Sequence, residues 1–245
     1  MSEQPARAWR VVLEHIERDL LEGRLGPGDR LASERELSGD LGVGRSSVRE
    51  AFRVLEVMGL IRTATGSGPQ SGAIVIATPT GGISALLRLQ VAAQGFPLDD
   101  VVQTRLVLED AVVSALAASA ERDTASAHQL LAAMDADGLT SSEFLTLDAQ
   151  LHLSLAEASG NTVIAAMMAG LRSSIESYVQ AGAATIPEWE AMAQRLRAEH
   201  RALVAAIDAA DVDGARALVR SHINGYYTAA GLTRAPAPPA PVIHD

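Results

Sequence analysis

Two short amphipathic segments joined by a tight glycine turn are the feature that most constrains this chain. The first segment can be capped by Ser33 and carries Leu37 and Leu41 on one helical face. Gly42-Val43-Gly44 then bends the chain, and a helical period resumes at Arg45. Two helices joined in this way form a helix-turn-helix, whose second helix enters the major groove of DNA.

The second helix, from Arg45 to Met58, separates into an apolar face and a polar face. The apolar positions recur at helical spacing and are expected to pack inward: Val48, Phe52, Leu55 and Met58. The polar positions on or beside the opposite face are Arg45, Ser46, Arg49 and Arg53. We expect this second set to meet phosphates and base edges.

Two short strand-like runs follow this helix and predict a β-hairpin. They are Leu60-Ile61-Arg62-Thr63 and Ala73-Ile74-Val75-Ile76, separated by the Gly-rich residues 65–72. Glycine lets a backbone approach a sugar-phosphate surface closely, so Gly66 suits the tip of a wing that enters a minor groove. An ordinary hairpin is the alternative, but the position directly after a helix-turn-helix favours a wing.

Three motifs in this region form a composite signature. They are Pro27-Gly28-Asp29, Ser33-Glu34-Arg35 and Arg45-Ser46-Ser47-Val48-Arg49-Glu50-Ala51. With the hairpin, they make the segment resemble the GntR family of bacterial transcription regulators. The resemblance implies a winged helix-turn-helix that contacts DNA through Arg35, Arg45, Ser46, Arg49 and Gly66. The chain departs from the family pattern at Ala32, where Pro is usual, and at Gly44, where a hydroxyl residue usually caps the helix.

Composition narrows the class of protein further. The chain has no cysteine, which excludes disulfides, thiolate metal sites and thiol catalysis. Its net charge of −10 is unevenly placed, since residues 1–80 hold 10 Arg and 11 acidic residues and the remainder hold 10 and 19. Apolar runs are too short to span a membrane, and the N-terminus has no apolar signal segment. We therefore expect a soluble cytoplasmic protein with no membrane partner.

The second half of the chain is predicted to be an antiparallel helical bundle. The run Thr78-Pro79-Thr80-Gly81-Gly82 interrupts the periodicity, so we expect a DNA-binding domain over 1–77, a linker over 78–82 and a helical domain over 83–232. The Pro-rich tail, 233–245, is predicted to be disordered. The expected helices are 83–94, 98–120, 124–136, 142–159, 162–183, 188–210 and 214–231. The fold class is therefore mainly α with a small β-wing.

Three histidines and one aspartate fall on the inward faces of these helices. Asp148 and His152 lie four residues apart along the apolar stripe of the helix at 142–159. His200 and His222 interrupt the apolar stripes of two later helices. Each histidine alone is more often a hydrogen-bonded core residue, but the four residues together offer ligands suited to Zn²⁺, Ni²⁺ or a similar ion.

An Arg-x-x-Leu-Glu element lies at Arg105-Leu106-Val107-Leu108-Glu109. With the aspartate and the three histidines, it makes residues 83–231 similar to the FCD effector domain of one GntR branch. In such domains an Asp and a His four apart, with two later His, bind a metal, which implies that role for Asp148, His152, His200 and His222. Leu151 stands where Phe is common, and Gln103 stands where an acidic residue often precedes the arginine.

The charges of this proposed pocket favour an anionic ligand. A divalent cation with one carboxylate and three neutral imidazoles keeps one positive charge, and an inward Arg105 adds another. A small hydroxy-carboxylate could chelate the metal while Arg105 binds its carboxylate. An ion pair with Glu109, one turn away, is the alternative use of this arginine. The runs Thr63-Ala64-Thr65-Gly66-Ser67-Gly68-Pro69 and Gly225-Tyr226-Tyr227 resemble L-lactate-responsive members of the family, which implies L-lactate as effector.

The leading hypothesis is a homodimeric repressor, not an enzyme, that binds a palindromic double-stranded operator. A small carboxylate, L-lactate first, would modulate its affinity beside a divalent metal, with Zn²⁺ expected and Ni²⁺ an alternative. A metal sensor, in which the ion itself is the signal, is one competing hypothesis. A metal-dependent hydrolase is the other, and Glu109 is its candidate base.

Overall fold

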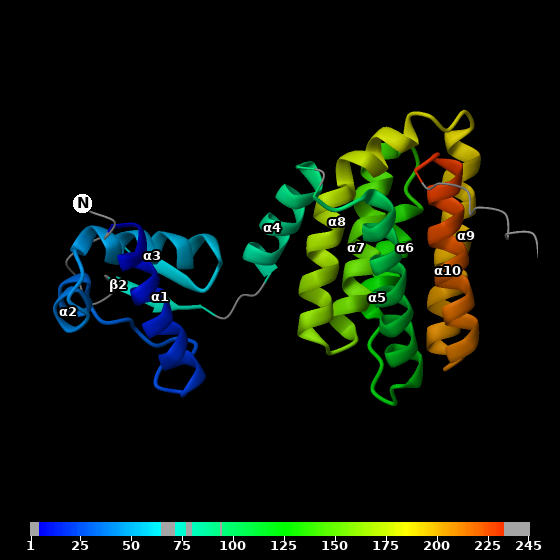
Figure 1. The fold of residues 1–245 in the computed structure, drawn as a ribbon. Coiled ribbons are helices and arrows are strands. Elements are labelled where there is room, and N and C mark those ends of the chain that lie inside the picture. The colour runs from blue at the N-terminus through cyan, green and yellow to red at the C-terminus, as the bar shows by residue number, and fades with distance from the viewer. Residues whose placement is uncertain (1–4, 65–71, 77–79, 94, 233–245) are drawn as a thin grey trace, which may run out of the picture. The chain divides into compact units, whose positions relative to one another are not determined.

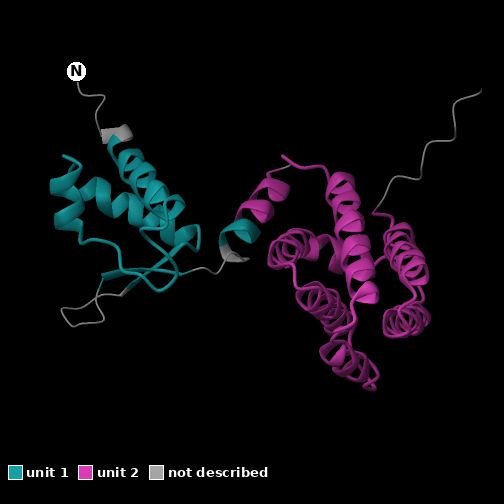
Figure 2. Ribbon diagram, turned by 90° about the horizontal axis from the view of Figure 1, so that it is seen from below, with its two compact units in different colours: residues 1–85 teal, residues 86–245 magenta. Residues whose placement is uncertain are grey.

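The computed structural model describes residues 5–64, 72–76, 80–93 and 95–232 (Figure 1). The chain divides into two compact units, residues 1–85 and 86–245 (Figure 2). The described residues form ten helices and one antiparallel pair of strands, which confirms the mainly helical fold class. Within these ranges, no helix combines the length and the apolar character needed to cross a lipid bilayer.

The N-terminal unit is a winged helix-turn-helix. Its elements are α1 (Pro5–Leu21), α2 (Glu34–Asp40), α3 (Arg45–Val57), β1 (Ile61–Ala64) and β2 (Gly72–Val75). The first helix was not among the predicted elements, yet it completes the small core of this unit. Val12 and Ile16, four residues apart on α1, are buried in one apolar cluster with Phe52 and Leu55 of α3.

The ends of α2 and α3 follow from their local sequence. Ser33 caps α2 in a capping box, because its Oγ accepts a hydrogen bond from the Glu36 amide while the Glu36 carboxylate accepts one from the Ser33 amide. The turn contains Gly42 at φ +62°, a conformation that favours glycine. Gly44 is the N-cap of α3 and offers no side-chain hydrogen bond. Met58, predicted to point inward, is instead 50% exposed because α3 ends at Val57.

The side chain of Glu56 on α3 forms hydrogen bonds with the first strand of the hairpin. The strands pair antiparallel, with Ile61 opposite Val75. Both residues are buried in the core of the N-terminal unit. The amide and hydroxyl groups of Thr63 donate to Glu56 Oε1 over 3.0 and 2.6 Å, so β1 is held against the end of α3. The predicted wing tip, including Gly66, lies outside the described residues.

The helices of the second half match the seven predicted from sequence, with ends that shift by a few residues. Their bounds are α4 (Thr80–Ala92), α5 (Leu98–Ala118), α6 (Ala125–Met134), α7 (Ser141–Ala158), α8 (Thr162–Ala183), α9 (Trp189–Asp208) and α10 (Val212–Ala229). The largest difference is at α4, which begins inside the predicted linker and contains the boundary between the two units.

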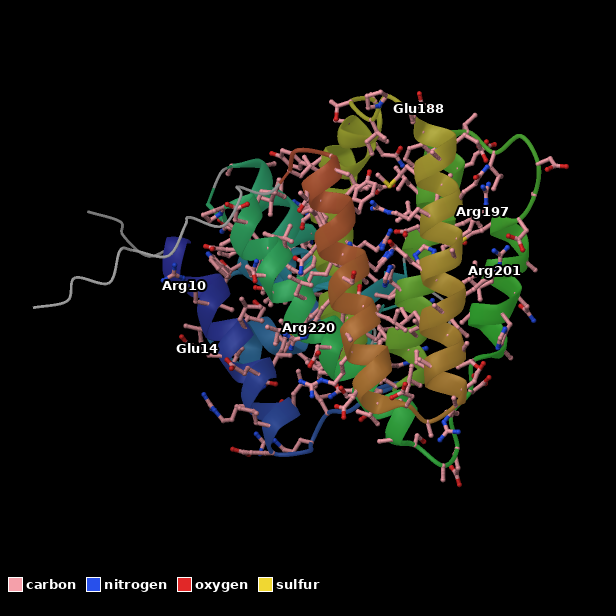
Figure 3. The ribbon with its side chains drawn as sticks, turned by 90° about the vertical axis from the view of Figure 1, so that its right-hand side faces the viewer. Arg10, Glu14, Glu188, Arg197, Arg201 and Arg220 are labelled. Carbon is pink, nitrogen blue, oxygen red and sulfur yellow. The ribbon has the colours of Figure 1, made fainter. Side chains whose placement is uncertain are left out.

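Helix α5 occupies the centre of the C-terminal unit and packs against α7, α8, α9 and α10. Figure 1 shows these helices running side by side as a bundle. Arginines on α9, labelled in Figure 3, tie that helix to the end of α6, since Arg197 Nε donates to the Met134 carbonyl over 2.8 Å and Arg201 pairs with Asp135. The inward faces of α5, α7, α9 and α10 therefore surround one interior.

The capping box of α7 gives a direct test of this fold. Thr140 Oγ1 accepts from the Glu143 amide, and the Glu143 carboxylate accepts from the Thr140 amide and hydroxyl. Thr140→Ala should lower the free energy of unfolding by about 1 kcal/mol, because the helix loses a capped amide. Urea unfolding followed by Trp189 fluorescence, in a Trp9→Phe background, measures this in the C-terminal unit.

The matched control is Ser142→Ala, an exposed hydroxyl residue in the same turn that does not cap the helix. This change should alter the free energy of unfolding by less than about 0.5 kcal/mol. Equal effects of the two substitutions would contradict the capping role of Thr140.

Candidate functional site

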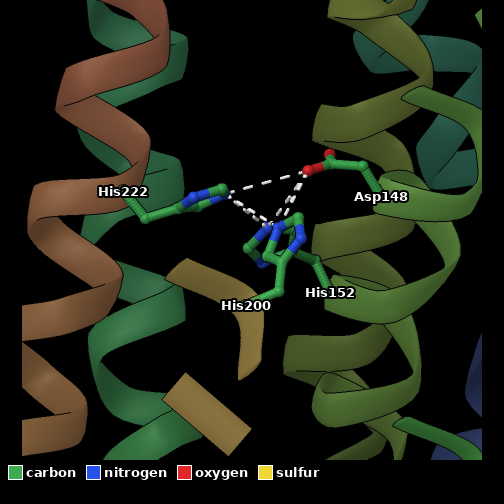
Figure 4. A group of neighbouring side chains, drawn as sticks. All are labelled: Asp148, His152, His200 and His222. Atoms are coloured by element: carbon green, nitrogen blue, oxygen red, sulfur yellow. Dashed lines mark hydrogen bonds and ion pairs between the residues drawn. The ribbon is translucent and has the colours of Figure 1, made fainter. Parts of the chain in front are cut away.

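Four predicted metal ligands meet in the interior of the C-terminal unit (Figure 4). Asp148 and His152 come from α7, His200 from α9 and His222 from α10, and all four are buried. One ligand atom of each lies within 4.8 Å of the others. His200 Nε2 is 3.1 Å from both Asp148 Oδ1 and His222 Nε2. Ligands bound to one Zn²⁺ ion are separated by about 3–3.5 Å, so this cluster has the dimensions of a metal site.

Two carboxylates fix the orientation of the clustered histidines. His152 Nδ1 lies 2.8 Å from Glu109 Oε2, and His222 Nδ1 lies 2.9 Å from Glu199 Oε2. An ionised carboxylate only accepts hydrogen bonds, so each Nδ1 carries the proton and each Nε2 presents a lone pair. These two Nε2 atoms are 3.2 Å apart. Facing lone pairs repel unless a cation lies between them, so the donor set fits a bound metal ion.

Burial and neighbouring side chains together hold three of these ligands in the protonation states that bind metal. Burial, and then the charge of His222, lowers the pKa of His200 to about 4. Burial also lowers the pKa of His152, although the Glu109 carboxylate opposes that shift. Burial alone would raise the pKa of Asp148, but the hydrogen bond with His200 and the charge of His152 hold it well below its usual value. At neutral pH His152 and His200 are therefore neutral imidazoles and Asp148 is an ionised carboxylate, which are the forms that bind metal.

Arg105 is connected to the cluster through Glu109. Its Nε donates to Glu109 Oε1 over 3.0 Å, and its Nη1 donates to Tyr227 Oη over 3.2 Å. Burial alone would lower the pKa of Arg105, but Tyr227 and Glu109 raise it, so the side chain stays cationic. The ion pair with Glu109 is thus present, and Arg105 also lines a cavity beside the cluster.

This cavity has a volume of about 200 Å³ and opens between α5, α7, α8 and α10. Its polar lining includes Arg105, Asp148, Arg172, His222, Tyr226 and Tyr227. Apolar side chains such as Leu145, Ile175 and Val179 complete the walls. A small, mostly apolar pocket with a few convergent polar groups is the usual form of a metabolite site.

Two polar residues of this site were not predicted from the sequence. Arg172 of α8 donates from Nη2 to Asp148 Oδ2 over 3.1 Å, and Glu199 of α9 holds His222. Arg172 directly follows the uncharged, mostly apolar run 163–171, and a charge at the end of such a run is a signal that could have identified it. Glu199 has no comparable signal, because its partner lies on another helix.

The predicted DNA-contacting side chains of α2 and α3 are exposed: Arg35, Arg45, Ser46 and Arg49. Between them, Ser47 and Val48 are buried, so α3 presents a polar face outward and an apolar face to the core. Arg49 Nε donates to Glu34 Oε2 over 2.9 Å, and both side chains remain accessible at 59% and 36%. This ion pair joins the outward faces of the two helices.

A winged helix-turn-helix followed by a helical unit with a small interior pocket is the architecture of a DNA-binding transcription regulator with a separate effector unit. Residues 10–69 match the family described as bacterial regulatory proteins, gntR family, and residues 100–225 match the FCD domain. The chain therefore belongs to the GntR family of regulators, in the branch that carries an FCD domain.

Relatives with established names are similar over most of the chain. It is 29% identical to the HTH-type transcriptional repressor NanR of Citrobacter rodentium over 220 residues, which cover 87% of this chain and 82% of the relative. It is 27% identical over 226 residues to an Escherichia coli K12 protein that carries a provisional name as an L-lactate dehydrogenase operon regulatory protein, with coverage of 91% and 86%.

The fold itself is shared with a solved structure of a Streptococcus agalactiae GntR protein. The TM-score is 0.61 at 23% identity, over 86% of this chain and 94% of that one. The family and these relatives are transcription regulators, so the chain is a regulator and not an enzyme. The geometry agrees with this, because both oxygens of Glu109, the candidate base of the hydrolase alternative, are engaged by Arg105 and His152.

The buried position of Glu109 predicts a pH-dependent contribution to stability. Burial alone would raise its pKa, but His152 and Arg105 lower it from 4.5 to about 2. Because the folded pKa is the lower one, the stabilisation is fully present above about pH 4.5 and is lost as the pH falls through about 2. In metal-free protein, Glu109→Gln should therefore lower the free energy of unfolding most at pH 6–7 and progressively less below about pH 4.5.

Urea unfolding between about pH 3.5 and 7 measures this difference. Glu157→Gln, which removes one negative charge from the exposed side of α7, is the control and should show a much smaller loss. A difference between Glu109→Gln and the native protein that stays constant down to the lowest pH would contradict the assignment.

Proposed function

We propose that this protein is a homodimeric repressor whose operator affinity changes when a small carboxylate, with L-lactate as first candidate, binds beside a divalent metal. The observation that carries the proposal is the buried cluster of one aspartate and three histidines next to Arg105 in a cavity of a GntR-family regulator. In this proposal residues 1–77 bind DNA, residues 83–232 bind metal and effector, and residues 78–82 connect them.

The metal would be held by Asp148, His152, His200 and His222, with Zn²⁺ first and Ni²⁺ as the alternative. A divalent ion with four protein ligands supplies further coordination positions for the carboxylate and hydroxyl oxygens of a hydroxy acid. Arg105 contributes a cationic side chain fixed at the edge of the same cavity.

One comparison makes L-lactate the first candidate, and the chemistry of the proposed site suits 2-hydroxy acids as a class. The Escherichia coli relative is provisionally named for an L-lactate dehydrogenase operon, and the similarity covers 91% of this chain. A 2-hydroxy acid also offers the two adjacent oxygen donors that chelate a metal.

Operator binding is assigned to the exposed side chains of the helix-turn-helix. Arg35, Arg45, Ser46 and Arg49 would contact DNA from α2 and α3, and Gly66 from the hairpin tip. The N-terminal 80 residues carry 10 Arg against 11 acidic residues, so general attraction to phosphate is weak. Tight binding then requires two recognition helices on two half-sites of a palindrome, which a homodimer provides.

Arg49→Ala should reduce affinity for the DNA upstream of the protein's own gene by about tenfold or more, because a guanidinium that reads a base edge contributes about 1–3 kcal/mol. The side chain is outward, so the circular dichroism spectrum should not change. Arg18→Ala, an exposed arginine on α1, removes the same charge from the same unit and should have a much smaller effect. Unchanged operator affinity in Arg49→Ala would refute the assignment of α3 as the recognition helix.

The effector assignment is tested by titrating L-lactate into a fluorescence-anisotropy assay of operator binding. Millimolar L-lactate should shift the affinity of the Zn²⁺-loaded protein by about 5-fold or more, a common size for allosteric coupling. The shift should vanish after chelation of the metal and in His200→Ala, while His128→Ala should behave as the native protein because His128 is an exposed residue paired with Asp208.

Two other outcomes separate the alternatives. Operator affinity that follows Zn²⁺ concentration without L-lactate would favour the metal sensor. Operator affinity that is insensitive to L-lactate in the metal-loaded protein would reject lactate as the effector.

A further inference from the structure

Arg172 carries hydrogen-bonding capacity that the described structure does not use. Its side chain lines the cavity beside the metal cluster and is only 14% exposed. Nη2 donates to Asp148 and to the Leu145 carbonyl, but Nε and Nη1 are buried without a hydrogen-bond partner among the described residues. A buried donor without an acceptor destabilises the protein, and more so when the group is charged. Because buried donors are normally hydrogen-bonded, we expect a bound acceptor beside these two nitrogens of Arg172.

The charges around the cavity indicate what that acceptor is. The buried Arg105 and the partly buried Arg172 balance two buried carboxylates, Glu109 and Asp148. A divalent cation among neutral imidazoles then leaves two positive charges in the interior.

Two further carboxylates near the site do not cancel this excess. Glu199 is paired with Arg195 over 3.2 Å, so that pair adds no net charge. Glu176 lies on the cavity wall with an exposed side chain, where water screens its charge. The buried interior of the metal-loaded protein would therefore keep two positive charges, which a dianion would neutralise.

We infer that the effector is a 2-hydroxy acid with a second carboxylate, and that Arg172 is the specificity-determining residue that binds this second group. The inference rests on the proposed metal-assisted binding of a small carboxylate, and within that class it replaces L-lactate, the first candidate, with a dicarboxylate. In this arrangement the hydroxy-carboxylate end lies at the metal cluster, and Arg172 keeps Nη2 on Asp148 while its two unpartnered nitrogens donate to the second carboxylate. A charge-assisted hydrogen bond in a buried site is roughly twice as strong as a neutral one.

L-lactate and L-malate form a matched pair of probes for this inference. L-malate is L-lactate in which one methyl hydrogen is replaced by a carboxylate, so both present the same hydroxy-carboxylate end. Isothermal titration calorimetry with the Zn²⁺-loaded full chain should show L-malate binding at least tenfold more tightly than L-lactate.

Substitutions at Arg172 assign the difference to this side chain. Arg172→Gln should lower the affinity for L-malate by a much larger factor than the affinity for L-lactate, and so remove the preference for L-malate. Arg172→Lys, which keeps the positive charge, should retain part of the preference. Arg201→Gln is the matched control, since Arg201 is an exposed arginine that pairs with Asp135 away from the cavity, and it should bind both ligands as the native protein does. Metal content and circular dichroism of each variant show whether the site is intact.

The outcomes separate the inference from the proposed function. Native protein that binds L-lactate as tightly as L-malate would overturn the inference and leave the carboxylate-responsive regulator standing, as would a preference for L-malate that survives in a folded, Zn²⁺-loaded Arg172→Gln. If the Zn²⁺-loaded native protein binds neither acid, the proposed carboxylate effector fails, and the refinement fails with it. If Arg172→Gln does not fold, the comparison of the two acids on the native protein and on Arg172→Lys decides.

Discussion

The repulsion between imidazole lone pairs that face one another is the constraint on which the C-terminal unit depends. Glu109 and Glu199 fix the protons of His152 and His222 on the outer nitrogens, so the inner nitrogens point at each other over 3.2 Å. A core formed by apolar side chains alone would contain no such repulsion. A cation relieves the repulsion, and a metal that binds only the folded state adds its binding free energy to folding.

Helix α5 connects this metal cluster to the cavity. Glu109 orients His152, and one turn earlier Arg105 holds Glu109 and reaches Tyr227 of α10. A ligand that competes for the Arg105 guanidinium therefore also acts on the carboxylate that orients a metal ligand. On the proposed function, two side chains of one helix would therefore link effector and metal, so that occupancy of the pocket could alter helix positions.

The sequence predicted the helices and the inward placement of the aspartate and three histidines well, because both depend on periodic patterns within single segments. Asp148 and His152 must share a face at a spacing of four, and the apolar stripes around His200 and His222 fix their inward direction. The partners of these residues could not be predicted in the same way. The contact of Glu199 with His222 and that of Arg172 with Asp148 depend on how separate helices are packed, which no local period reports. The exposure of Met58 shows the same limit at a helix end, where the period no longer applies.

The ion pair between Arg49 and Glu34 has a consequence for target selection. On the proposed function, the guanidinium is already satisfied by an internal carboxylate before any DNA arrives. A DNA phosphate binds the guanidinium only slightly better than that carboxylate does. DNA of random sequence therefore gains little binding free energy when a phosphate displaces the carboxylate. The major-groove edge of guanine has two acceptors in the geometry that a guanidinium binds, so guanine can displace the Glu34 carboxylate from Arg49. The Glu34 carboxylate thereby lowers the affinity of the domain for incorrect DNA sequences. A domain with no surplus of positive charge can then remain selective in a large excess of competing genomic DNA.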